Sequence, residues 1–183
     1  DYDVDGYSST YLLYDYFTNL KIDCDYYIPD RIIDGYGPNI SLLKRLISRK
    51  KYSLIIFVDC GSNSFDEINY LEKAGINILI IDHHQIHEHK KFKKTIIINP
   101  LKNPLLDKYK YFCATTLVFF FILFLSDKLK IKINNVKSKY LFFAAIATIC
   151  DQMPLRNINK KIVKIGLGDF NLSKFKSLSK IIN

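Results

Sequence analysis

Closely spaced cysteine pairs are absent from this sequence: Cys24, Cys60, Cys113 and Cys150 all stand more than four residues apart. This spacing excludes a zinc knuckle and a redox Cys-x-x-Cys motif. We expect the four thiols to act as small apolar side chains in a reducing compartment.

A hydrophobic run long enough to span a bilayer is also lacking. The most apolar stretch, 112–125, is short, contains two threonines and is bracketed by Lys110 and Lys128, so it predicts a buried helix. The first twenty residues contain no basic leader, and residue 1 is an aspartate. We therefore expect a cytoplasmic protein without membrane contacts, and a fragment of a longer chain because no initiator Met is present.

The composition favours a folded domain with a basic surface. Hydrophobic residues make up 49% and aromatic residues 14% of the chain, which argues against disorder. A net charge of +9 suits a polyanionic partner such as nucleic acid. Solubility or a lysine-biased composition would give the same excess, so the charge alone leaves both explanations open.

Short apolar runs rich in β-branched residues predict buried parallel strands. Three such runs are 53–59, 76–84 and 95–100, and an alternating segment, 21–29, is a fourth candidate. Between them we expect helices that begin near Ser8 or Ser9, at an Asn39 cap, and at a capping box formed by Ser64 and Glu67.

After residue 105 the pattern becomes helical, over about 112–126, 136–150, 158–166 and 171–182, with loops at 127–138 and 156–161. Strands that alternate with helices predict an α/β fold: a doubly wound, mainly parallel sheet flanked by helices and followed by a helical C-terminal part. We expect one domain over 1–155, and in 156–183 the start of a helical connector to a second domain.

Metal-ligand residue types follow the apolar runs. Asp59 ends one predicted strand, Asp82-His83-His84 ends the next, and Asp1, Asp3 and Asp5 open the chain. A lone Asp at a strand end is usually a loop or cap residue, but several carboxylates at one sheet edge repel one another unless cations neutralise them. The sequence therefore predicts a metal site, with Asp82 orienting the adjacent imidazoles.

The opening Asp-x-Asp-x-Asp-Gly also matches the start of an EF-hand loop. That loop requires a glutamate at its twelfth position, where this chain has Leu12. The EF-hand interpretation therefore fails. A tight turn remains, with Gly6 expected to permit an unusual backbone angle. His87 and His89 lie in a lysine-rich stretch, and we expect both to be exposed.

In order, the Asp-x-Asp-x-Asp-Gly opening, Val-Asp-Cys-Gly at 58–61, Asp-His-His at 82–84 and the segment 147–155 resemble the four motifs of the DHH phosphoesterases. Two further likenesses narrow the resemblance to the RecJ exonucleases within that family. Tyr27-Ile28-Pro29-Asp30-Arg31 and Asp34-Gly35-Tyr36-Gly37 resemble one RecJ segment, and 147–155 resembles the RecJ fourth motif. Cys150 and Gln152 depart from the usual residues beside that motif's aspartate.

The resemblance implies a ligand set for two divalent ions, Mn²⁺ or Mg²⁺. Asp59 would be shared between the two metals, His83 would be a ligand and Asp151 would close the sphere. The other ligands would be Asp1, Asp3 and Asp5, although many members of the family outside RecJ have His where Asp1 stands. The ions would acidify a bridging water and clamp the phosphate. His84 would bind the phosphate or assist proton transfer, and the catalytic residues would be Asp59, Asp82 and His84.

Arg31 is a candidate phosphate contact, with a surface salt bridge to Asp30 or Asp34 as the alternative. Tyr36 and Tyr27 are candidates for stacking on a base, or for simple packing. The resemblance implies a 5′→3′ exonuclease that is specific for single-stranded DNA and acts in repair and recombination. We expect it to be a monomer that binds other repair proteins. The alternatives are a phosphodiesterase for short oligonucleotides or cyclic dinucleotides, and an inactive nucleic-acid-binding scaffold.

Overall fold

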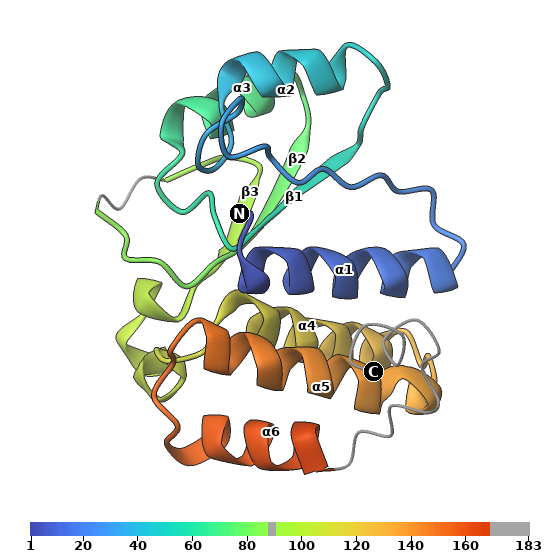
Figure 1. Ribbon diagram of the computed structural model, residues 1–183. Helices are drawn as coiled ribbons and strands as arrows, with labels where there is room; N and C mark the ends of the chain where they lie inside the picture. The colour runs from blue at the N-terminus through green and yellow to red at the C-terminus, as the bar shows by residue number, and fades with distance from the viewer. Residues whose placement is uncertain (88–90, 169–183) are drawn as a thin grey trace.

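A three-stranded parallel sheet forms the centre of the computed structural model, which describes residues 1–87 and 91–168 (Figure 1). The strands are β1 (Leu54–Val58), β2 (Asn77–Ile81) and β3 (Thr95–Ile98), in the order β1-β2-β3. Val58 pairs with Ile81, and Ile81 pairs with Ile98. The three predicted apolar runs are confirmed as neighbouring strands.

Helices cover both faces of this sheet (Figure 1). One face packs against α2 and α3, and the other packs against α1, α4 and α5. The helices of the described chain are α1 (Val4–Asn19), α2 (Ile40–Ile47), α3 (Phe65–Lys73), α4 (Ala114–Lys128), α5 (Asn134–Cys150) and α6 (Asn157–Gly168), with 3-10 turns η1 (Pro100–Lys102) and η2 (Pro104–Tyr109).

Alternation along the strands assigns each side chain to one of two cores. Phe57, Ile78 and Ile80 pack with α2 and α3, whereas Leu79 and Ile81 pack with α1, α4 and α5. Successive strand side chains point to opposite faces, so a strand covered on both sides must be apolar throughout. The predicted α/β fold with flanking helices and a helical C-terminal part is confirmed.

Two of the predicted helix starts, at Asn39 and Ser64, are confirmed, and the third is wrong. Asn39 caps α2 as predicted, because its side chain accepts a hydrogen bond from the Leu42 amide. The start at Ser8 or Ser9 is wrong: α1 begins at Val4, since Asp3 accepts from the Gly6 amide and caps the helix earlier. Ser64 does precede α3, but its side chain makes no cap hydrogen bond, so the predicted capping box is wrong.

The fourth predicted strand, 21–29, is also wrong, because this described segment pairs with no strand. Its alternating apolar residues are not buried: Ile22 is 48% and Tyr26 is 59% exposed. Two of its carboxylates instead reach Lys50, at 2.9 Å from Asp23 and 3.1 Å from Asp25. Alternation predicts a strand only where a neighbouring strand and a core are available to receive it.

The C-terminal part is helical, as expected, with two differences in extent. The loops predicted at 127–138 and 156–161 are shorter than expected, because α4 extends to Lys128, α5 begins at Asn134 and α6 begins at Asn157. The helix expected over 171–182 lies outside the described residues, and the boundary at residue 155 stays a prediction. Within the described residues, every helix is too short or too polar to cross a bilayer.

The contact between α5 and α6 depends on Gly166. A Cβ at this position would lie 2.6 Å from the Leu141 carbonyl oxygen and 2.7 Å from the Ala145 Cβ, whereas Gly168 on the same helix faces open space. We expect Gly166→Ala to lower the free energy of unfolding by about 1–3 kcal/mol, because α6 must move away from α5. Gly168→Ala is the matched control, with no loss expected. Urea denaturation of both variants checks this, and equal stabilities would contradict it.

Candidate metal centre

The carboxyl ends of the three strands place Asp59, Asp82 and Asn99 in one row. Each follows the last residue of its strand, and the ladder continues through them: the Asp59 amide donates to the Ile81 carbonyl, and the Asp82 amide donates to the Ile98 carbonyl, both at 3.0 Å. This sheet edge is where ligands bind in open α/β folds. The predicted convergence of polar residues at one edge is therefore present.

The start of α1 brings the first acidic cluster to the same edge. Asp3 caps the helix, and Asp1, Asp3 and Asp59 each offer an oxygen within 4.8 Å of the others. Gly6 lies inside α1 rather than in the expected turn with an unusual backbone angle. A glycine is required there for a different reason, because a Cβ would lie 2.7 Å from atoms of Asp1.

Asp5 is oriented by α4, which begins 109 residues later in the chain. The amides of Ala114 and Thr115 donate to its two carboxylate oxygens at 2.6 and 2.8 Å, and the Thr115 hydroxyl donates to the Asp5 carbonyl. Free amides at a helix N-terminus favour a negative charge, which stabilises a buried carboxylate. No local sequence pattern indicates this contact between two distant segments.

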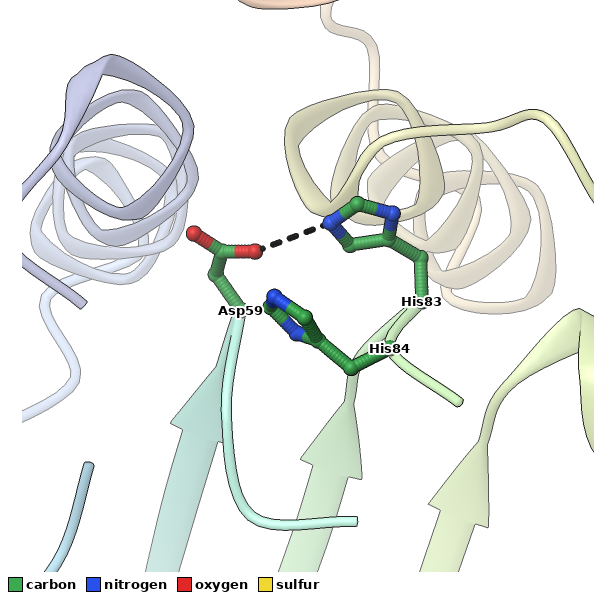
Figure 2. A group of neighbouring side chains, drawn as sticks. All are labelled: Asp59, His83 and His84. Carbon is green, nitrogen blue, oxygen red and sulfur yellow. Dashed lines mark ion pairs between the residues drawn. The ribbon is translucent and has the colours of Figure 1, made fainter. Parts of the chain in front are cut away.

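His83 is the centre of the candidate site. Its Nε2 lies 3.2 Å from Asp59 Oδ1, 3.5 Å from Asp151 Oδ2 and 3.7 Å from Asp5 Oδ2. Figure 2 shows the imidazoles of His83 and His84 approaching Asp59 from the end of β2, with the dashed line marking the contact to His83. Asp151 lies at the C-terminal end of α5. The structure thus brings together all six predicted metal ligands, from α1, β1, β2 and α5.

Several polar atoms of this cluster have no hydrogen-bond partner among the described residues. They are both oxygens of Asp59, Nε2 of His83 and Oδ2 of Asp151, all buried. Leaving such atoms unpaired costs about 1–3 kcal/mol each, so each calls for an explanation. Oxygen and imidazole donors converging on one space fit divalent cations such as Mn²⁺ or Mg²⁺. The residues present therefore fit the predicted ions.

The electrostatics agree with a cation-binding role. Burial, together with the charges of Asp5 and Asp3, raises the pKa of Asp59 well above its ordinary value. Burial likewise raises the pKa of Asp151, although the nearby His83 partly opposes this. Asp59 also has a left-handed backbone, with φ of 58°, which costs about 1–3 kcal/mol in a residue other than glycine. Strain and crowded charge at one residue are typical of a functional site.

Asp82 and His84 form a separate pair beside the cluster. Asp82 accepts hydrogen bonds from the amides of Ser62, His83 and His84, and His84 Nδ1 lies 2.7 Å from its Oδ1. Burial opposes the ionisation of Asp82, but these hydrogen bonds outweigh it and hold its pKa well below the ordinary value. The hydrogen bond to Asp82 raises the pKa of His84. Asp82 thus contacts the backbone of both histidines and the ring of His84, and its role in orienting the imidazoles stays a prediction.

A cavity of about 400 Å³ adjoins His84. It is lined by Tyr36, the loop 60–64 after β1, and residues around Gln85. The Tyr36 hydroxyl lies 3.2 Å from His84 Nε2. His87, at the rim, is exposed as expected, whereas His89 lies outside the described residues.

Arg31 and Tyr27 have different surroundings. The Arg31 guanidinium lies over the Tyr2 ring at 5.4 Å, and Tyr2 is edge-on to Tyr36. Within the described chain no carboxylate pairs with Arg31, and Asp34 instead pairs with Arg45 at 3.1 Å. Tyr27 hydrogen-bonds to Asp34 and Arg45, so its hydroxyl is engaged in the fold. The packing alternative therefore fits Tyr27 better than stacking on a base.

Two further residues, Asn99 and Ser62, lie at the site and were missed by sequence reasoning. The Asn99 side chain reaches both Ser62 and the His84 carbonyl, and the Ser62 amide reaches Asp82. A signal for Asn99 was available, because it follows the third apolar run as Asp59 and Asp82 follow the first two. Ser62 has no comparable signal in the sequence.

Comparison with known proteins identifies the domain. The model of the DHH family, N-terminal domain, matches residues 1–148. The chain belongs to the DHH family. This DHH domain is 32% identical over 167 residues to the single-stranded-DNA-specific exonuclease RecJ of Bacillus subtilis, covering 91% of this chain and 20% of the relative. It is 28% identical to RecJ of Thermus thermophilus, covering 97% of this chain and 25% of the relative.

Solved structures agree with this assignment. A crystal structure of exonuclease RecJ bound to manganese aligns with a TM-score of 0.79 and 28% identity, over 92% of this chain and 41% of that one. RecJ from Thermus thermophilus in complex with Mn²⁺ aligns with a TM-score of 0.74 and 26% identity, over 92% of this chain and 23% of that one. The predicted resemblance to RecJ is confirmed, and the DHH domain spans a minor part of each of these relatives.

Proposed function

We propose that this chain is the catalytic part of a single-stranded-DNA exonuclease that hydrolyses phosphodiester bonds with two divalent ions, Mn²⁺ or Mg²⁺. The likeness to single-stranded-DNA-specific exonucleases supports the substrate. The 5′→3′ direction and a role in repair and recombination are further parts of the proposal. The observation that carries the proposal is the group of buried side-chain oxygen and nitrogen atoms of Asp59, His83 and Asp151 that make no hydrogen bond within the described residues. Such a group is costly in a protein without cations and useful in one that binds them.

Six residues would hold the ions: Asp1, Asp3, Asp5, Asp59, His83 and Asp151. Asp59 belongs to a group with Asp1 and Asp3, and its Oδ1 lies 3.2 Å from His83 Nε2, which supports a role as a ligand shared between the two ions. Bound divalent ions would activate water and neutralise charge on the phosphate. The start of α4 holds Asp5 in place through a backbone amide. The Asp82 carboxylate accepts hydrogen bonds from the backbone amides of His83 and His84.

His84 is the residue suited to contact the phosphate. Its Nδ1 is held by Asp82, which leaves Nε2 directed to Tyr36 at the cavity. The hydrogen bond to Asp82 raises the pKa of His84 and so favours the protonated ring. An imidazolium there can bind a phosphoryl oxygen and donate its Nε2 proton to the departing oxygen.

The surroundings of His84 suit a nucleotide strand. A cavity of about 400 Å³ is large enough for one nucleoside, since small-ligand sites begin at about 300 Å³. Tyr36 forms part of its wall and offers an aromatic face for a base. Arg31 lies over the Tyr2 ring and has no carboxylate partner in the described chain, so its guanidinium would be available to bind a neighbouring phosphate.

The proposal predicts release of mononucleotides from single-stranded DNA in the presence of Mn²⁺. The test uses the full-length protein and three substrates: a 5′-labelled single strand, the same sequence as a duplex, and a dinucleotide. We expect stepwise loss from the labelled 5′ end of the single strand and little cleavage of the duplex. A label that survives until last would contradict the 5′→3′ direction.

Other outcomes would change the proposal. Rapid turnover of the dinucleotide without digestion of DNA would indicate the small-substrate phosphodiesterase. Binding of DNA and Mn²⁺ without any hydrolysis would indicate an inactive scaffold. The expectations of a cytoplasmic monomer with repair partners stay predictions, and so does the domain boundary at residue 155.

A further inference from the structure

Two asparagines after β3 share one local role. Asn99 and Asn103 both precede a proline and cap a 3-10 turn, and their backbones are almost the same, with φ, ψ of −144°, 122° and −136°, 119°. In each, Oδ1 accepts a hydrogen bond from the amide two residues later, at 2.9 and 3.0 Å. This capping role requires only an acceptor oxygen, which Asp or Ser also supplies.

Asn99 differs from Asn103 in what its amide nitrogen does. Asn99 is buried, with 2% exposure, whereas Asn103 is exposed. The Asn99 Nδ2 donates to the Ser62 hydroxyl at 3.0 Å and to the His84 carbonyl at 2.9 Å. Both of its hydrogens are therefore used, and they join the loops that follow β1 and β2 to the end of β3.

These two contacts reach the residues that set the site geometry. The Ser62 amide donates to Asp82 Oδ2 at 3.0 Å, and Asp82 Oδ1 holds the backbone and ring of His84. Asn99 therefore fixes the turn at both ends, through the serine beside Asp82 and through the carbonyl of His84. The orientation of this turn decides where the two imidazoles point.

We propose that Asn99 is a positioning residue whose amide nitrogen holds the Asp82–His84 turn so that His83 faces the cation cluster and His84 faces the cavity. The cluster belongs to the proposed function, and the role of Asn99 rests on it. The Asn99 side chain donates to none of the ligands' donor atoms, and Asn99 does not itself line the cavity. Its effect passes through the backbone of His84 and through Ser62.

The test compares Asn99→Asp with Asn103→Asp in the full-length protein. Asp keeps the cap oxygen at both positions but replaces the donating nitrogen with an oxygen, which matters only where that nitrogen is used. We expect Asn99→Asp to raise the Mn²⁺ dissociation constant, measured by electron paramagnetic resonance of free Mn²⁺, by roughly 10–100-fold. Excess Mn²⁺ should recover part of the lost hydrolysis rate. For Asn103→Asp we expect a wild-type dissociation constant and rate.

Asn99→Ser is the second variant, because it keeps a short cap oxygen without adding charge and serves if Asn99→Asp fails to fold. Wild-type Mn²⁺ affinity and rate in a folded Asn99 variant would overturn the inference. An equal loss in Asn103→Asp would do so too, because it would assign the effect to the cap. A wild-type protein that neither binds Mn²⁺ nor hydrolyses single-stranded DNA would instead overturn the proposed function.

Discussion

Asp59→Asn should abolish most of the hydrolytic activity and yet stabilise the metal-free protein. Replacing a residue that only hydrogen-bonds to a metal ligand lowers activity by roughly 10–100-fold. Replacing Asp59, whose two oxygens are themselves candidate ligand atoms, should lower activity further. The substitution is otherwise gentle, because Asn tolerates the left-handed backbone of residue 59. Single-turnover hydrolysis of single-stranded DNA measures the first effect. Unfolding in a chelator measures the second.

The stabilisation follows from the burial of a carboxylate that accepts no hydrogen bond from the residues that the structure describes. Asp59 is 1% exposed, and neither oxygen has a hydrogen-bond partner in the described chain. Replacing this buried carboxylate with a neutral amide should raise the free energy of unfolding of the metal-free protein by about 1–3 kcal/mol. Asp66→Asn is the matched control, because Asp66 is exposed in the first turn of α3, and there we expect no gain.

The pH dependence of this gain has a definite sign. The folded-state pKa of Asp59 is raised, so the metal-free folded protein binds more protons than the unfolded chain above about pH 4. Wild-type stability should fall as the pH rises from there through the raised pKa, and the advantage of Asp59→Asn should grow over the same range. An advantage that shrinks as the pH rises would show that Asp59 is not the unfavourable charge.

The sequence predicted which residues gather at the candidate site better than it predicted the contacts that hold them there. Asp59, Asp82 and His83 could be found because each follows an apolar run, and parallel strands end at one sheet edge. The contact between Asp5 and the start of α4 could not be found, because 109 residues separate the partners and no local pattern links them. The segment 21–29 failed for a related reason, because strand formation depends on a neighbour that periodicity alone does not reveal.

Replacing each of the two adjacent histidines with asparagine should impair a different property of the protein, Mn²⁺ binding at residue 83 and kcat at residue 84. We expect His83→Asn to weaken Mn²⁺ binding by more than roughly 100-fold, because it removes the Nε2 that lies 3.2–3.7 Å from three carboxylates. His84→Asn should bind Mn²⁺ with near wild-type affinity but lower kcat by roughly 10²–10⁴-fold, the usual contribution of a proton donor. Mn²⁺ titration and steady-state hydrolysis on the same two variants measure both effects.

Asparagine suits this comparison because its amide can replace Nδ1 but does not reach as far as Nε2. At residue 84 it can keep the hydrogen bond to Asp82 and remove only the Nε2 that meets Tyr36. His84 also offers a ring nitrogen within 4.8 Å of ligand atoms of Asp59 and His83, so it has an alternative role as a metal ligand. Strong loss of Mn²⁺ affinity in His84→Asn would establish that alternative and remove His84 as the phosphate contact. Intact affinity with a lowered kcat would separate the cation-binding histidine from the substrate-facing one.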